Sequence, residues 1–400
     1  MLRYPAWLRH PVWLLAVVVG CLIAQSCATV GSNSADPPPP PSVLGRSTST
    51  ERPSPPSSQP APALTPTSRP STTSRPSTTS RPSTTSRPST TSRPSTTTEP
   101  REPARGRLVI QGAGDTNLDP SYIPALTANG YGHALDGLEG LFLEDSLTVV
   151  NLECTPSDEG SRQPRPFNFR CDPDALPFLA DHGVEVVNLA NNHSMDYGGD
   201  ALVDSIANVR EAGLSPVGAG RDRTEAFTPA SLSYNGWNVA VLGFGGVYLA
   251  RNWLATDEQP GMSDGLDLEA TVAAIEAAAA THDIVVVTIH WCCELQTQPN
   301  ARNREHAEAF VTAGADVIFG HHHHRLQPME MIDNTPVFWG LGNFVWPRFS
   351  AAGSTTAVAR VEINPDGRVV ACQLPATIVS NGHPTLDGPT PQRRCEGEGR

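Results

Sequence analysis

The chain has 400 residues, 39 prolines, no lysine and a formal net charge of −13. The charge is uneven: residues 1–107 hold 12 arginines against four acidic residues, so residues 108–400 carry a net charge near −21. Such an acidic region argues against nucleic acid as the main partner, although acidity that serves only solubility is common. An anionic substrate would need a local positive site there.

Residues 1–27 have the pattern of an export signal. Basic residues precede an apolar run from Val12 to Ala24, which is shorter than the roughly 20 residues of a membrane span. Three alternatives stay open: cleavage after the small residues at 24–26, lipidation at Cys27 (which fits better than Cys21), and an uncleaved signal anchor. We expect an exported protein at the extracellular face of a bacterial membrane or in the cell wall, possessing either a lipid anchor at Cys27 or none.

Residues 28–104 have the composition of a disordered linker. Arg-Pro-Ser-Thr-Thr-Ser recurs with arginine at every sixth position from 69 to 93. This tract is too polar to bury apolar area, and its prolines keep it extended. It is either a stalk behind the export signal or a neutral repeat, and we favour the stalk. A globular domain is expected over 105–380, followed by a disordered tail over 381–400.

The globular part alternates strands with helices at first and then continues mostly in hairpins. Asn235-Gly236 is a strong hairpin signal between 230–234 and 239–243. This order predicts a layered α/β domain with a mixed sheet or two stacked sheets. The remaining strands are expected at 108–111, 147–151, 184–189, 284–289, 317–319, 326–332, 336–341, 356–363 and 368–378, and the helices from Pro173 and over 197–212, 268–280 and 304–313.

Polar side chains follow several of these apolar strands directly. Taken singly, Asp115 would be a turn residue, Glu153 a solvated side chain and His290 a core histidine. Ligand sites of α/β folds lie at the carboxyl ends of strands, so the recurrence of such residues there favours a metal site with oxygen and nitrogen ligands. The clusters begin at Gly114, Asn151, Asn191, His290, Gly320 and Leu341.

Two clusters suggest individual roles. Asn192 would be a neutral oxygen ligand and His193 a proton donor, unless the segment is only a helix cap. In the run 321–324, His322 and His324 would point the same way on an extended stretch; the alternative is a metal store. Glu294 could hold the second ring N–H of His290.

Six cysteines remain if Cys27 is lipidated and Cys21 removed, and an even number in an exported chain indicates disulfides. Local spacing favours two pairs, with Cys292 and Cys293 either bonded to each other or not at all. The two pairs are Cys154–Cys171 and Cys372–Cys395.

In their order, these clusters resemble the bacterial capsule synthesis protein CapA (poly-γ-glutamate capsule biosynthesis) family over roughly residues 107–345. The motifs include Gly114-Asp115, Asn151-Leu152-Glu153, Asn191-Asn192-His193, His290-Trp291 and Gly342-Asn343-Phe344. The resemblance implies a calcineurin-like metallophosphoesterase fold, a four-layer α/β/β/α sandwich.

The same resemblance implies two divalent metal ions, of Mn, Fe, Zn or Mg, and His193 as the catalytic residue that protonates the leaving group. Asn117 stands where the wider superfamily often has a histidine ligand. The implied metal ligands are Asp115, Glu153, Asn192, His290, His322 and His324.

The sequence therefore predicts an exported CapA-like protein that takes part in capsule or cell-surface polymer biosynthesis. Our first hypothesis is a metal-dependent hydrolase acting on a phosphoester or an anionic surface polymer. The alternative is a non-catalytic accessory factor that binds or anchors such a polymer.

Overall fold

The computed structural model describes residues 105–144, 147–388 and 393–395. The predicted export signal and linker, with Cys27 and the arginine repeat, lie outside the described residues. Within the described ranges no helix combines the length and the apolar character needed to cross a membrane.

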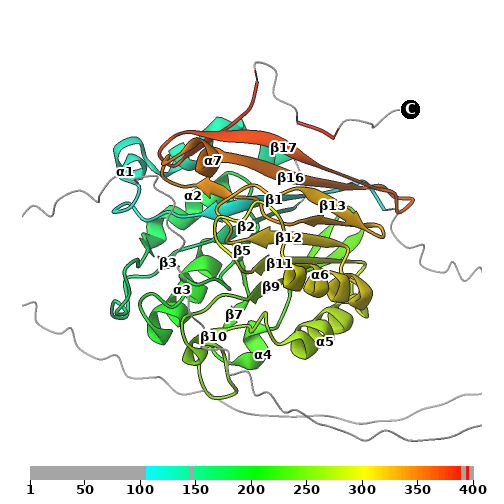
Figure 1. Cartoon of the computed structure of the whole chain (residues 1–400), viewed down its shortest axis with the longest axis horizontal. Coiled ribbons are helices and arrows are strands. Elements are labelled where there is room, and N and C mark those ends of the chain that lie inside the picture. The colour runs from blue at the N-terminus through cyan, green and yellow to red at the C-terminus, as the bar shows by residue number, and fades with distance from the viewer. Residues whose placement is uncertain (1–104, 145–146, 389–392, 396–400) are drawn as a thin grey trace, which may run out of the picture. The chain divides into compact units, whose positions relative to one another are not determined.

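The described residues form two sheets packed face to face (Figure 1). In the first sheet β1, β2, β5 and β6 are parallel, and β16 to β18 continue it antiparallel beyond β1. Its order is β18 (His383–Leu386), β17 (Val369–Ser380), β16 (Thr355–Ile363), β1 (Leu108–Thr116), β2 (Leu147–Leu152), β5 (Val186–Asn188) and β6 (Ser215–Val217), and β15 (Asn343–Val345) also pairs with β1.

In the second sheet β9, β11, β12 and β14 are parallel, and an antiparallel strand closes each edge. β11 is buried along its whole length and largely apolar, as expected for a central strand covered on both faces. The order is β13 (Met329–Ile332), β14 (Thr335–Phe338), β12 (Val317–His321), β11 (Ile284–His290), β9 (Trp237–Gly245) and β8 (Ala230–Tyr234).

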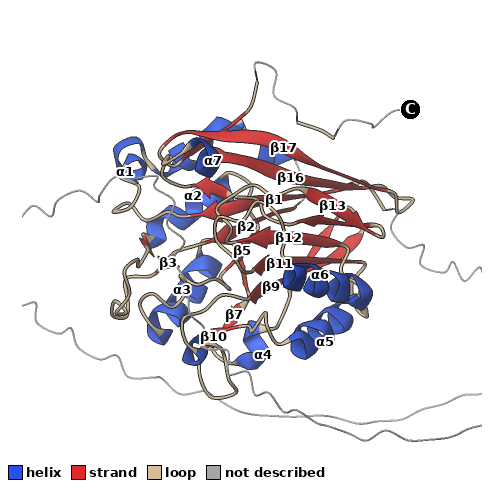
Figure 2. Cartoon of the chain, viewed as in Figure 1, coloured by secondary structure: helices blue, strands red, loops and turns tan. Residues whose placement is uncertain are grey.

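Helices cover the outer face of each sheet (Figure 2). α2 (Leu176–Asp181) and α3 (Gly199–Glu211) bury apolar side chains against the first sheet, while α5 (Leu268–Ala279) and α6 (Ala301–Ala313) do so against the second. A third apolar cluster, which includes Val149 and Val286, fills the space between the sheets. The predicted four-layer α/β/β/α sandwich is therefore confirmed.

Shorter elements fill the connections. The two-stranded pairs are β3 (Thr155–Pro156) with β4 (Arg170–Cys171), and β7 (Ala219–Gly220) with β10 (Gly261–Met262). The short helices are α1 (Ala125–Asn129), α4 (Arg223–Ala226), α7 (Ala351–Ser354) and the 3-10 turns Tyr131–Ala134, Asp136–Leu138, Leu141–Glu144, Pro173–Ala175 and Arg251–Trp253.

The prediction of a disordered tail over 381–400 is wrong for its first part. β18 pairs with β17 and buries Pro384 and Leu386, so alternate residues of this short segment complete the sheet. Cys395 is bonded to Cys372 of β17, which fastens residues 393–395 as well. The segment is too short for its alternation to be recognised without its partner strand.

All three cysteine pairs among the described residues are bonded. Cys154–Cys171 joins the segment after β2 to β4, with the Cα atoms 5.7 Å apart. Cys372–Cys395 has a Cα separation of 5.5 Å, and both distances lie in the usual range for disulfides. The spacing-based pairs are confirmed, and of the two alternatives for Cys292 and Cys293 the structure has the vicinal bond.

Candidate metal centre

The carboxyl ends of the two sheets converge on one buried cluster of acidic and imidazole groups. Asp115 is the second-to-last residue of β1, Glu153 follows β2, and His290 ends β11. The loop after β12 contributes His322 and His324. The structure thus brings together, from both sheets, five of the six residues predicted as metal ligands, and their side chains form overlapping groups with ligand atoms within 4.8 Å of one another.

Glu153 lies at the middle of this cluster. Its carboxylate is fully buried, and neither oxygen has a hydrogen-bond partner. Oε1 lies 3.9 Å from Nε2 of His193, 3.9 Å from Nε2 of His290 and 3.8 Å from Nε2 of His324. A buried carboxylate without partners is costly, so these distances indicate a position that a cation completes.

Asp115 is held by a row of amides that runs across the first sheet. Asp115, Asn151 and Asn188 are cross-strand neighbours in β1, β2 and β5. Nδ2 of Asn151 donates to Oδ1 of Asp115 at 2.9 Å, and Nδ2 of Asn188 donates to Oδ1 of Asn151 at 3.1 Å. Oδ2 of Asp115 is left for other contacts and lies 3.1 Å from Nδ1 of His324.

Asn192, the sixth predicted ligand, sits beside His290. Its Oδ1 lies 2.8 Å from Nε2 of His290, and Asn151 approaches Nδ1 of the same ring at 3.1 Å. The expectation that Glu294 holds the second ring nitrogen of His290 is wrong, because Asn151 occupies that position. Glu294 is exposed instead and lies 4.0 Å from Nε2 of His322, where it forms a third group with His322 and His324.

The histidine run does not continue the strand. β12 ends at His321, and His322 and His324 take positive φ values of 87° and 52°. The two rings converge, with centroids 5.9 Å apart, because the backbone is left-handed rather than extended as predicted. Such conformations cost about 1–3 kcal/mol each and concentrate at functional sites. Nδ1 of His324 is fixed by Oδ1 of Asn343 at 2.8 Å.

His193 borders the cluster as an imidazole with its own carboxylate. Its Nδ1 lies 2.7 Å from Oδ2 of Asp196, and its ring packs against Phe169 with centroids 4.3 Å apart. Arg165 donates to Oδ1 of Asp196 at 2.7 Å and also to the carbonyl of Asn192. This arrangement leaves Nε2 of His193 directed toward Glu153, as a proton donor at the centre requires.

Burial and neighbouring charges set the protonation of these groups. Burial alone would raise the pKa of Asp115, but the hydrogen bond and charge of His324 hold it below its usual range. Burial, and after it the charge of Asp115, raises the pKa of Glu153 well above its usual range. Burial opposes the charging of His324, yet Glu153 and Asp115 raise its pKa to about 9. Asp115 is therefore ionised and His324 is charged at neutral pH.

Burial keeps two other rings neutral. It lowers the pKa of His322 to about 3, with His324 adding to the effect, and it lowers the pKa of His290 well below its usual value. Burial also lowers the pKa of His193, while the hydrogen bond that the ring donates to Asp196 acts in the opposite direction. Neutral imidazoles are the form that binds divalent metals.

The donor set fits divalent ions. Asp115, Glu153 and His324 form one group, and Glu153, His290 and His322 form another, so Glu153 is common to both. Carboxylate and imidazole ligands suit Mn, Fe, Zn and related ions, and the unpartnered oxygens of Glu153 are what a bridging ligand needs. The assignment of individual ligands, Asn192 included, and of His193 as proton donor stays a prediction.

Sequence reasoning missed the supporting side chains. The row from Asn151 to Asn188 left a readable signal, because both asparagines stand near the ends of neighbouring apolar strands. Arg165 left none, since its contact with Asp196 depends on how the loops fold back.

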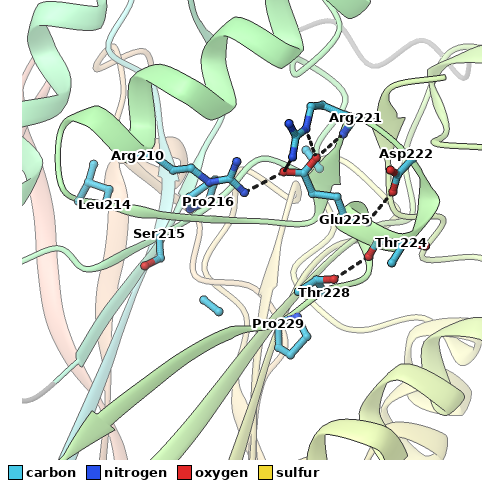
Figure 3. Close-up of a pocket in the computed structure, with 12 residues that line it drawn as sticks. Arg210, Leu214, Ser215, Pro216, Arg221, Asp222, Thr224, Glu225, Thr228 and Pro229 are labelled. Atoms are coloured by element: carbon cyan, nitrogen blue, oxygen red, sulfur yellow. Dashed lines mark hydrogen bonds and ion pairs between the residues drawn. The ribbon is translucent and has the colours of Figure 1, made fainter. Parts of the chain in front are cut away.

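A hollow of about 440 Å³ lies away from this cluster, where α3 and β6 meet α4 (Figure 3). Glu225 joins Arg210 at 2.9 Å and Arg221 at 2.8 Å in its wall. Those charges satisfy one another, and none of the predicted site residues lies among the described residues that line this hollow. The predicted site residues therefore gather at the strand ends and not in this hollow.

The sequence profile of the family described as bacterial capsule synthesis protein PGA_cap matches residues 109–348. A relative from Bacillus subtilis (strain 168), PGA biosynthesis protein CapA, is 34% identical over 235 residues, which are 58% of this chain and 61% of the relative. Capsule biosynthesis protein CapA of Bacillus anthracis is 35% identical over 208 residues, 51% of this chain and 50% of the relative. The match thus spans between half and about three fifths of these relatives' length.

Among solved structures, 5'-nucleotidase from Candida albicans SC5314 aligns with a TM-score of 0.40 and 10% identity, over 69% of this chain and 52% of that one. A likeness at this level says nothing about the chemistry of this chain. The family profile is different, because it covers every strand end that builds the metal centre, from β1 to β15. The chain therefore belongs to the bacterial capsule synthesis protein CapA (PGA_cap) family.

Proposed function

We propose that this domain is a metal-dependent hydrolase that acts on a phosphoester or an anionic cell-surface polymer during capsule biosynthesis. The observation that carries the proposal is the buried carboxylate of Glu153, which has no hydrogen-bond partner and lies within 4 Å of three imidazole nitrogens. A protein that only bound a polymer at its surface would gain nothing from this costly arrangement.

Two divalent ions held by the groups that share Glu153 would polarise the bond to be cleaved and supply a hydroxide at neutral pH. Asp115 and Glu153 would neutralise much of their charge, and the amide of Asn151 orients Asp115. The ions also explain how a domain with a net charge near −21 could receive an anionic substrate.

His193 would deliver the proton to the leaving group. Its Nδ1–H donates to Asp196, which favours the charged ring and fixes its orientation, so that Nε2–H faces the centre. Arg165 in turn holds Asp196, and Phe169 covers one face of the ring and limits access of water. His193 thus has the orientation and the partner of a general acid.

Export and tethering are part of the proposal. The three disulfides of the described region support an oxidising compartment, because such bonds are rare in the cytosol. In this account the export signal places the domain outside the membrane, and the linker over 28–104 holds it there, anchored at Cys27 or released.

The test combines metal content with turnover. The full chain, loaded with Mn²⁺ or Zn²⁺, is assayed on bis-p-nitrophenyl phosphate, p-nitrophenyl phosphate and poly-γ-glutamate, beside His193→Gln and, as a control, His306→Gln on α6. We expect turnover by the wild type and the control, and a loss of about 10²–10⁴-fold in His193→Gln with its metal retained. Bound metal without turnover on any substrate would overturn the hydrolase and leave polymer binding as the function.

A further inference from the structure

A second hollow, of about 350 Å³, adjoins the metal centre. His322 belongs to its wall, so the hollow begins where the candidate ligands end. The rest of the wall comes from three other segments: the loop after β9 with Val247 and Tyr248, the segment before α5 with Leu266, and the loop after β11 with the Cys292–Cys293 disulfide. It therefore offers room beside the reacting group rather than at it.

The walls of this hollow are largely apolar. Leu266 lines the hollow and packs near Gly246, since its Cδ2 would lie 3.6 Å from a Cβ placed on that glycine. Gly246 in turn donates its N–H to the carbonyl of His290 at 2.7 Å. The apolar wall is thus tied by backbone to the strand that carries a candidate ligand.

The loop that carries the Cys292–Cys293 disulfide is also held in place by hydrogen bonds. The carbonyl of Cys292 accepts from Nδ2 of Asn303 at 2.8 Å, and the N–H of Leu295 donates to the carbonyl of His323 at 2.8 Å. The loop that carries the disulfide is therefore fixed to α6 and to the histidine loop. A wall held in this way keeps its shape relative to the metal centre.

The charge of the hollow selects against anions. Among the described residues that line it, the only side chain charged at neutral pH is Glu294, which is exposed. Burial raises the pKa of the Tyr248 hydroxyl. The charge of Asp264 raises this pKa further, and the charge of Arg251, which does not line the hollow, lowers it. A substrate group that enters here meets sulfur, aliphatic and aromatic surface and one carboxylate.

We propose that the hollow walled by Leu266, Tyr248 and the Cys292–Cys293 disulfide is a subsite for an uncharged, apolar group of the substrate. The inference rests on the proposed function and narrows its substrate class. The anionic reacting group of the substrate would lie at the metals. The part of the substrate on the side of Glu294 would be neutral and apolar, such as an aryl or alkyl substituent. A polymer with a carboxylate at that position is disfavoured.

Binding of inert phosphonates to the metal-loaded full chain tests the inference without turnover. Isothermal titration calorimetry compares methylphosphonate, phenylphosphonate and 4-carboxyphenylphosphonate, which share the anionic group and differ in the flank. We expect phenylphosphonate to bind about ten-fold more tightly than methylphosphonate, because its ring buries apolar area. The added carboxylate of the third compound should remove most of that gain.

Two matched variants locate the effect. Leu266→Glu places a charge in the hollow, and Leu249→Glu places the same charge next to Tyr248, at a side chain that is 61% exposed and outside the lining. The phenyl preference should fall to within about two-fold in Leu266→Glu and persist in Leu249→Glu. A Cys292→Ala/Cys293→Ala variant should weaken phenylphosphonate more than methylphosphonate.

The outcomes separate the two proposals. Equal affinity of methyl- and phenylphosphonate, or a phenyl preference that survives in Leu266→Glu, would overturn the subsite while the metal-dependent site stands. Failure of every phosphonate to bind the metal-loaded chain would overturn the anion-binding metal centre, and the subsite with it.

Discussion

Two fully buried glutamates show opposite solutions to the same electrostatic problem. Glu362, on β16, accepts from Nε of Arg360 at 2.7 Å and from Arg107 at 2.7 Å, so its charge is neutralised by the chain itself. Glu153 is as deeply buried, but neither of its oxygens has a hydrogen-bond partner and its nearest cationic group is the ring of His324.

The difference separates a structural carboxylate from a functional one. Burial of an unpaired charge costs several kcal/mol, and a fold tolerates it where a ligand repays the cost. At Glu362 the guanidinium groups supply the compensation at folding. At Glu153 the imidazole nitrogens stay 3.8–3.9 Å away, and under the proposed function bound cations would supply the compensation.

The largest expected effect is at the paired glutamate. Glu362→Gln leaves the buried guanidinium of Arg360 without its carboxylate, and it should lower the free energy of unfolding by about 3–5 kcal/mol. Urea denaturation followed by circular dichroism measures this. Glu308→Gln, on the exposed side of α6, is the control. A loss below about 1 kcal/mol would remove the contrast between the two glutamates.

Glu153→Gln should act in the opposite direction. Without metal, the neutral amide is easier to bury, so we expect the variant to be about 1–2 kcal/mol more stable than the wild type. Added Mn²⁺ at about 100 times its Kd should stabilise the wild type by about 2.7 kcal/mol and the variant hardly at all. Thermal unfolding with and without metal measures both. A variant that is destabilised without metal would contradict the comparison.

A smaller effect is expected at Glu185, a partly buried carboxylate that directly precedes β5, at the end of the strand opposite Asn188. Burial raises its pKa to about 7, although the N–H of Thr148 donates to it at 2.7 Å. Between the ordinary value of 4.5 and about 7, the folded chain keeps a proton that the unfolded chain has released, so stability falls as pH rises through this window.

Glu185→Gln should therefore lose less stability than the wild type between pH 4.5 and 8. Denaturation midpoints across this range measure the effect, and Glu211→Gln at the exposed end of α3 is the control. Parallel pH profiles for the wild type and Glu185→Gln would show that burial of this carboxylate does not make stability fall as pH rises.

The sequence predicts the strand ends well because each one is local. Asp115, Glu153 and His290 follow apolar strands whose direction places them at one edge. What brings them together is not local: the strand register that aligns Asp115, Asn151 and Asn188 exists only in the folded sheet. Motif order indicates the members of the centre but not the amides that hold it.

The backbone conformation of the loops also could not be predicted from the sequence. The two converging histidines were predicted on extended chain, and they reach the centre instead through left-handed residues that spacing does not reveal. Glu294 was placed beside His290 because it is near in sequence, yet the loop turns it toward His322. The strand at His383–Leu386 was missed because its four residues gain their burial from β17 and from the distant turn Asp136–Leu138.

Metal stoichiometry tests the central claim most directly. The purified full chain is incubated in turn with Mn²⁺, Fe²⁺, Zn²⁺ and Mg²⁺, freed of excess ion and measured by elemental analysis beside Glu153→Gln. We predict about two ions per chain for at least one of these metals, and less than one in the variant. A wild type that retains none of the four would contradict the assignment of Glu153 as the carboxylate shared by two bound ions.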